Sequence, residues 1–519
     1  MFKNIIRTRH IFTLCILFTL PLISSAFPMS FNITDYGAKG DGSTLNTKSI
    51  QSAIDACARS GGGTVYFPAG KYLSGTIFLK SHITLNLDAG AVLLGSKKLN
   101  DYPVTVPRIR SYTDEYTDKS LIYGEGLEHI AITGQGMMDG NGGSFKGPYK
   151  VRPFMIRIIS CKNVLIKDVT IINSPMWVQH FLACENVNID GITVNSRVNE
   201  NNDGIDIDGC KNVRISNCDI ISGDDAIVLK STLDKPCDNV TVTNCVLSSI
   251  CNAFKLGTET NGGFQNIILN NCAIYDTPLA GIALELVDGG TLSRVSVSNV
   301  TMNNVGTAIF IRLGNRARPF KENMAKPGMG KLSDVIINNV QATNVGNIGC
   351  SITGLPEHPA ENITLKNIRL TFQGGGTRDL VNREIPEVPE VYPEYTMFGK
   401  LPAYGFYCRH AENLTFNDVE LDFIDPEERP AIVFDDIVGL DLHKIKARVM
   451  GSEPLIQCKD VRDMFIQSCI APVDIETFLH ISGNRSKHIT LLGNDLSGAK
   501  NPIKKEDHIE VYLDSNRLK

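Results

Sequence analysis

The sequence lacks the features that mark several large classes of protein. Among its 519 residues, Lys and Arg total 51 and Asp and Glu total 56, so no basic excess is available to follow a nucleic-acid backbone. Beyond the first 26 residues, no apolar run reaches the roughly 18 residues that a membrane-spanning helix needs. Hydrophobic residues make up 42% and charged residues 21%, an ordinary globular composition that argues against disorder. General nucleic-acid binding and a membrane span are therefore not expected.

The first 26 residues have the layout of a secretory signal peptide. Basic residues precede an apolar run over Ile11–Leu22, and small residues at 24–26 suit a cleavage site. The run is too short to span a bilayer. We therefore expect residues 1–26 to be removed. The remaining chain, residues 27–519, is expected to be exported to the periplasm or the cell exterior as a single domain.

The cysteines are spaced too regularly for a disulfide framework and too widely for a zinc site, which needs close pairs. Thirteen of the fourteen remain after cleavage, and an odd number argues against complete pairing. Two series recur at intervals of 23 to 27 residues: Cys161, Cys184 and Cys210, and Cys218, Cys245 and Cys272. This rhythm predicts small apolar residues stacked in successive repeats.

A repeat of 20 to 30 residues organises most of the chain. Each copy holds short segments of alternating apolar and polar residues, separated by Asn, Gly and Ser, with no helix-length segment between them. One register is occupied by Asn163, Asn186, Asn212, Asn239 and Asn266. Such a period predicts an all-β coil, a single-stranded parallel β-helix with one turn per repeat. Stacked side-chain amides would explain the Asn column.

Two segments depart from this repeat. Ile50, Ala53, Ile54 and Cys57 fall at helical spacing, which predicts a short helix over about residues 46–60. Such a helix would cap the open N-terminal end of the coil. Residues 374–406 are rich in Pro, Glu and Tyr and have no strand pattern, which predicts a long loop. Loops of this length in compact proteins are usually functional or disordered.

Three carboxylates are expected to gather on two successive turns. Alignment of the repeats places Ile205 and Ile227 in one core column. The alternate position on five successive turns is expected to face solvent: Asp206, Val228, Lys255, Ala283 and Phe310. Asp203 and Asp225 then share a column just before this strand, with Asp224 beside them. Like charges at this range repel and separate their pKa values, which suits a general acid and a general base. A solvated acidic turn or a calcium site is the alternative, although calcium prefers loop oxygens.

The sequences around these carboxylates, NNDGIDI and GDDAIVLK, resemble the polygalacturonases of glycoside hydrolase family 28. Similarity also covers segments that begin at residues 31, 46 and 173. The resemblance implies a right-handed parallel β-helix that hydrolyses galacturonate-containing pectin with inversion, without a metal or another cofactor. By motif position, it implies that Asp224 is the general acid and that Asp203 and Asp225 activate water.

The chain departs from the family pattern at two places. Cys251-Asn252-Ala253 stands where the family has Gly-His-Gly, and Ala283-Leu284-Glu285 stands where it has Arg-Ile-Lys. A uronate carboxylate would still need a cation, ideally a bidentate Arg. Lys255 and Arg312 are the candidates, against an interpretation as plain surface charge. The residues expected at the substrate are Asn252, Lys255, Arg312, Lys230 and Trp177.

Trp177, the only tryptophan, lies one repeat before Asp203. It would either stack on a sugar ring or pack in the core, and the sequence leaves both open. A single tryptophan also argues against an appended carbohydrate-binding module. His180 follows in the same segment and is expected to be structural.

The expected function is hydrolysis of a pectic polysaccharide, of the polygalacturonase or rhamnogalacturonan type, by a monomer. The 374–406 loop could close one end of the groove and make the enzyme exo-acting. One alternative is a β-helix polysaccharide lyase, which would use Ca²⁺ with an Arg or Lys base. The other is a non-catalytic rod that binds glycans.

Overall fold

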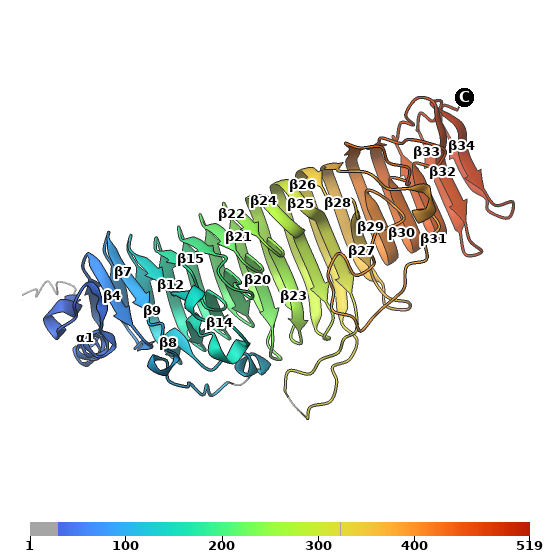
Figure 1. The fold of residues 1–519 in the computed structure, drawn as a ribbon. Coiled ribbons are helices and arrows are strands. Elements are labelled where there is room, and N and C mark those ends of the chain that lie inside the picture. The colour runs from blue at the N-terminus through green and yellow to red at the C-terminus, as the bar shows by residue number, and fades with distance from the viewer. Residues whose placement is uncertain (1–29, 110, 322, 519) are drawn as a thin grey trace, which may run out of the picture.

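The computed structural model describes residues 30–109, 111–321 and 323–518, so the predicted signal peptide lies outside the described residues. Within these ranges, thirty-five strands, from β1 (Ser30–Asn32) to β35 (Val511–Asp514), form one continuous coil. Figure 1 shows the turns stacked along one long axis. Strands of neighbouring turns pair in parallel, as β17 (Ile205–Asp208) does with β20 (Ile227–Ser231). This confirms the predicted all-β parallel β-helix.

The middle of the coil combines short strands with several long ones. Each long strand bends around more than one face of its turn, as β24 and β25 do while paired along most of their length. The bounds of the strands in this region are β14 Gln179–Leu182, β18 Lys211–Ser216, β19 Asp219–Ser222, β23 Phe254–Thr260, β24 Phe264–Leu286, β25 Thr291–Leu313, β26 Lys331–Val345, β27 Cys350–Thr353, β28 Ala360–Phe372, β29 Phe406–Phe423, β30 Ile432–Ala447 and β31 Ile456–Gln467.

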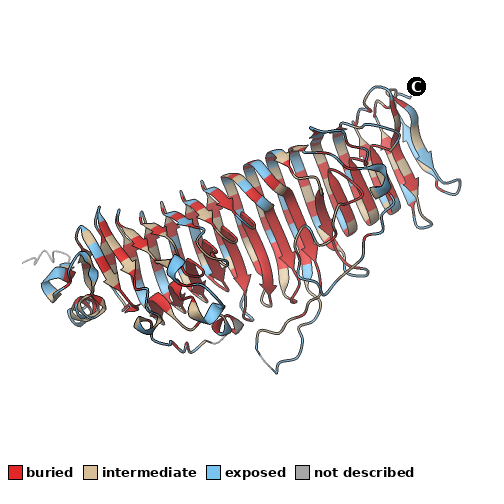
Figure 2. Cartoon of the chain, in the orientation of Figure 1, coloured by how far each residue is buried: buried red, intermediate tan, exposed pale blue. Residues whose placement is uncertain are grey.

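The core is a stack of aliphatic side chains inside the coil. Alternate residues of a strand point inward, so Ile205, Ile227 and Phe254 occupy one buried column on successive turns. Figure 2 shows buried residues running along the strands from turn to turn. The cysteines follow the same rule. All thirteen in the described residues are free, and the amide of Cys184 donates to the sulfur of Cys210 on the next turn.

The predicted Asn column forms a ladder along the outside of the coil. Each member adopts a left-handed backbone, with φ between 56° and 57°, a conformation that Asn tolerates better than most residues. The Nδ2 of Asn212 donates to Oδ1 of Asn186 at 3.1 Å, and Asn239 donates in turn to Asn212 at 3.0 Å. The column therefore satisfies a turn geometry and bonds adjacent turns together.

The N-terminal helix α1 (Thr47–Arg59) is present where the sequence predicts it. Its buried face consists of the four residues that fall at helical spacing: Ile50, Ala53, Ile54 and Cys57. It packs against η1 (Ile33–Tyr36), β1 and β3 (Gly63–Phe67) and covers the first turn of the coil. No helix in the described part of the chain is long and apolar enough to cross a bilayer.

The segment between β28 and β29 has no strand and contains one short 3₁₀ helix, η6 (Arg378–Leu380). Ile385, Phe398 and Leu401 are buried in an apolar cluster with Tyr407 and Val433, so the segment lies against the coil. It covers an outward face of the strands.

The burial of this outward face corrects one expectation from the sequence. The outward positions on five successive turns, Asp206, Val228, Lys255, Ala283 and Phe310, were expected to face solvent, but all are buried. Tyr395 and Met397 of the segment pack against Ala283 and Phe310. The outward column is therefore a second, covered layer.

The Asn ladder gives a test of what the turns contribute. In Asn212→Ala, a residue without the amide must adopt a left-handed φ, so we expect the free energy of unfolding to fall by about 1–2 kcal/mol. In Asn212→Gly, glycine adopts the left-handed φ without strain and only the hydrogen bonds of the ladder are lost, so this variant should be less destabilised. Urea midpoints measure both effects, and an Ala variant that unfolds at the wild-type midpoint would contradict this account.

Candidate active site

The register of the coil brings the three predicted carboxylates together. The amide of Gly204 donates to the carbonyl of Asp225 at 2.9 Å, and the amide of Ala226 donates to the carbonyl of Asn252 at 2.9 Å. Asp203, Asp225 and Asn252 therefore follow one another on three successive turns, each just before a strand. Asp224 lies beside Asp225 at the same edge.

The three carboxylates differ in their access to solvent. Asp203 and Asp225 are 2% and 4% exposed, whereas Asp224 is half-buried. The Nδ2 of Asn201 donates to Oδ2 of Asp224 at 3.4 Å, and the amide of Asp225 donates to its other oxygen at 3.0 Å. One oxygen of Asp224, one of Asp225 and the sulfur of Cys251 lie within 4.8 Å of one another. Asp224 is thus the member of the cluster that a ligand reaches most easily.

Burial and mutual repulsion act on the protonation of this cluster. Burial raises the pKa of Asp203 well above its usual range, and the charges of Asp206 and Asp224 add to the effect. Burial also raises the pKa of Asp206 to about 8 and, together with the charge of Asp225, raises the pKa of Asp224. Burial and repulsion therefore favour a proton retained within the cluster at a pH where isolated aspartates have lost theirs.

Two buried lysines lie among these carboxylates, and the first is Lys230. Its Nζ lies 3.5 Å from Asp203, 3.6 Å from Asp206 and 3.7 Å from Glu259. Burial opposes the charge of Lys230, but Asp203 and Asp206 outweigh it and raise the pKa of the ammonium group. The cation is therefore held inside the protein by the carboxylates around it.

Lys255 has a similar environment one turn further along. Its Nζ lies 3.4 Å from Asp225, 3.7 Å from Glu285 and 3.5 Å from Glu394. Because these carboxylates already neutralise it, Lys255 is badly placed to receive a uronate, contrary to the expectation from the sequence. The same holds for Lys230. Both lysines instead hold the acidic cluster together.

Asn252 contacts the acidic cluster and is fully buried. Its Nδ2 donates to Oδ1 of Asp225 at 2.9 Å, and its Oδ1 accepts from the amide of Ala280 at 2.9 Å. These bonds fix the Asp225 carboxylate and leave Asn252 little freedom to bind a sugar. The residue that replaces the family's His is therefore best described as a positioning residue.

Arg312 and Trp177 are also buried, and neither lines the cavity of about 860 Å³ next to Asp224, which argues against the direct sugar contacts expected from the sequence. Arg312 is 2% exposed, donates to the carbonyls of Gly354 and Glu387, and lies over the ring of Phe398. It anchors the segment between β28 and β29.

Trp177 is 5% exposed and packs between Phe154 and His180, with Lys230 at 4.8 Å from its ring centre. His180 bonds Asp208 at 3.3 Å, and burial lowers the pKa of its imidazole. Both side chains thus support the turn beneath the acidic cluster.

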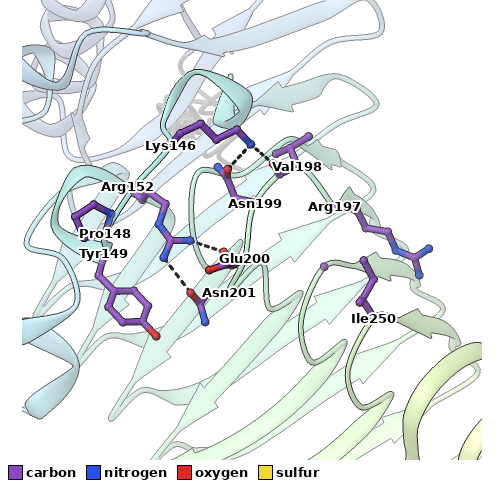
Figure 3. A pocket seen from close by; sticks show the side chains of 12 residues that line it. Lys146, Pro148, Tyr149, Arg152, Arg197, Val198, Asn199, Glu200, Asn201 and Ile250 are labelled. Carbon is purple, nitrogen blue, oxygen red and sulfur yellow. Dashed lines mark hydrogen bonds between the residues drawn. The ribbon is translucent and has the colours of Figure 1, made fainter.

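A cavity of about 860 Å³ lies next to Asp224. Figure 3 shows the side chains that line it, among them Lys146, Arg152 and Arg197, with Tyr149 on one side. Burial and then Tyr116 raise the pKa of Tyr149, and the charges of Asp224 and Asp203 add to this, so the cavity adjoins the acidic cluster. Sequence reasoning missed these cations. They come from two loops outside the repeat register, and no motif marks them.

The chain is similar to known proteins in family, in sequence and in structure. The model of the glycosyl hydrolases family 28 matches residues 57–387. A probable polygalacturonase of Vitis vinifera is 40% identical over 224 residues, which cover 40% of this chain and 45% of that protein. An exo-poly-alpha-D-galacturonosidase of Dickeya chrysanthemi is 33% identical over 263 residues, which cover 40% of this chain and 43% of that protein. The chain therefore spans less than half the length of these two relatives.

Solved structures give the same fold. An exopolygalacturonase of Thermotoga maritima matches with a TM-score of 0.57 at 25% identity, over 66% of this chain and 87% of that one. A family 28 exopolygalacturonase of Yersinia enterocolitica matches with a TM-score of 0.55 at 21% identity, over 82% of this chain and 80% of that one. At this identity the second likeness concerns the fold alone.

The neutralising role of Lys255 can be tested by removing its charge. In Lys255→Met, the buried carboxylates of Asp225 and Glu285 lose their cation, so we expect the unfolding free energy to fall by about 3–5 kcal/mol. Adding Glu285→Gln should restore part of this loss. Urea denaturation provides the measurement, and Lys211→Met, which removes an exposed lysine on β18, is the control. A Lys255→Met protein as stable as the control would refute the role.

Proposed function

Because the chain belongs to the glycosyl hydrolases of family 28, and is therefore a glycoside hydrolase, we propose that it cleaves galacturonate-containing pectic polysaccharide. We further propose that it acts with inversion and is exported. The observation that carries the proposal is the meeting of Asp203, Asp224 and Asp225 on two adjacent turns beside an open cavity. Hydrolysis with inversion needs one protonated carboxyl and one ionised carboxylate at a single site.

Asp224 is the proposed general acid. It is the most accessible of the three carboxyls, and burial together with the charge of Asp225 raises its pKa, so it retains a proton to give to the leaving oxygen. Its contact with Asn201, which lines the cavity, helps to fix the orientation of the carboxyl.

Asp225 and Asp203 are the proposed partners that activate water. Asp225 accepts hydrogen bonds from the side chain and the amide of Asn252 and faces Lys255, contacts that suit a carboxylate receiving a proton. Asp203 faces Lys230 from the preceding turn. The two lysines thus offset the repulsion that would otherwise keep such a cluster apart.

The covering segment supports exo action. Glu394 lies 3.5 Å from both Asn252 and Lys255, and Tyr395 donates to the carbonyl of Pro278 at 3.1 Å. The face of the coil just C-terminal to the acidic cluster is therefore occupied by the chain's own residues. We propose that the end of the bound polysaccharide chain lies against these residues.

Replacing the proposed acid tests the mechanism. In Asp224→Asn the leaving oxygen loses its proton donor, so we expect kcat to fall about 10²–10⁴-fold with an unchanged urea midpoint. In the wild type, the rate should fall as pH rises through the raised pKa of Asp224, because the acid must be protonated to act. Asp219→Asn, at an exposed position on β19, should remain active. Full activity of Asp224→Asn would favour a non-catalytic rod.

The products released early from polygalacturonate test the remaining parts of the proposal. Exo action predicts one short product from the first minutes, whereas a ladder of mixed oligomers would refute it. Proton NMR of the fresh product should show the inverted anomer, and a retained anomer would exclude inversion. A product that absorbs in the near ultraviolet, with activity abolished by a chelator, would instead identify a lyase.

A further inference from the structure

The cations around the acidic cluster divide into two kinds. Lys230, Lys255 and Arg316 are neutralised by buried carboxylates, the last by Asp288. Lys146 and Arg152 have no ion pair with any residue in the described ranges, and the same is true of Arg197. All three of these unneutralised cations line the cavity beside Asp224.

Neutral acceptors hold these cations in place without cancelling their charge. Lys146 donates to the carbonyl of Val198 and to Oδ1 of Asn199. Arg197 donates from Nε to the carbonyl of Ser222 at 3.0 Å and from Nη2 to the hydroxyl of Ser248 at 2.8 Å. The cavity is thus built to keep positive charge at fixed positions.

Arg152 links the cavity to the proposed general acid. Its guanidinium donates to the carbonyl of Glu200 and to Oδ1 of Asn201, whose Nδ2 donates to Asp224. The side chain is 4% exposed, and its Nε is buried without a hydrogen-bond partner among the described residues. With this donor unpaired and no carboxylate in ion-pair contact within the described ranges, the guanidinium keeps its positive charge beside the cavity, where it attracts an anion.

The remaining lining suits a sugar ring. Tyr149 is 39% exposed and stacks on Tyr116 with ring centres 4.8 Å apart, which holds its ring rigidly at the cavity wall. Amphipathic aromatic rings of this kind commonly pack against sugars. Glu200 is the one carboxylate in the lining, so the three cations give the cavity a net positive charge.

We propose that this cavity binds the carboxylate of a uronate unit next to the scissile bond, between Arg152, Arg197 and Lys146. The inference rests on the proposed function and adds the position of the charged sugar unit. The face beyond Lys255 is covered and neutralised, so the anionic unit binds on the N-terminal side of Asp224. Arginine is well suited to binding a carboxylate because its planar guanidinium can donate two parallel hydrogen bonds to the two oxygens.

Direct binding tests the site without cleavage. In an Asp224→Asn background, calorimetry would compare trigalacturonate with its trimethyl ester. We expect the free acid to bind more tightly, and Arg197→Gln to weaken its binding by about 10-fold or more, because charge-assisted hydrogen bonds to the carboxylate are lost. Binding of the ester should stay unchanged. Lys211→Gln, an exposed charge outside the cavity, is the matched control.

The outcomes separate this inference from the proposed function. An acid-over-ester preference that survives Arg197→Gln, or no binding of trigalacturonate at all, would overturn the cavity as the uronate site. Lys146→Gln, at an exposed position, gives a second measurement and should weaken binding of the free acid in the same way. If the wild-type protein cleaves no pectic fraction but the binding results are as expected, the cavity is supported as the uronate site and the proposed hydrolysis is refuted.

Discussion

In-register parallel pairing of successive turns is the constraint on which the rest of the structure depends. Each strand bonds to the equivalent strand of the next turn, so a residue at one place in the repeat lies directly beside its counterparts. The same constraint builds the apolar core, the Asn ladder and the acidic cluster. A one-residue slip would turn the core outward, and the many paired turns prevent it.

That constraint also creates an electrostatic difficulty. Placing Asp203 and Asp225 in one column forces like charges together in a region with little access to water. A second column of charges offsets this repulsion. In it, Lys230 and Lys255 lie between carboxylates from several turns. The site is therefore a layer of paired charges outside the core, covered on one side and open at Asp224.

The parts of the site that depend on the repeat could be predicted from the sequence, and the parts that depend on tertiary contacts could not. The meeting of Asp203, Asp224 and Asp225 follows from counting residues between repeats, and α1 follows from its own apolar spacing. By contrast, Glu394 reaches Asn252 across 142 residues, and Lys146 reaches Asn199 across 53. No periodic signal encodes such contacts. For this reason Lys255 and Phe310 were expected at the surface and are buried, and the cations of the cavity were missed.

The unpaired cysteines have a consequence for how the coil responds to reducing agents. Every cysteine in the described ranges is a free thiol, and twelve of the thirteen are buried as small core residues. The described turns are held by stacked backbone bonds and apolar packing, with no disulfide between them. Reducing agents should therefore leave these turns paired.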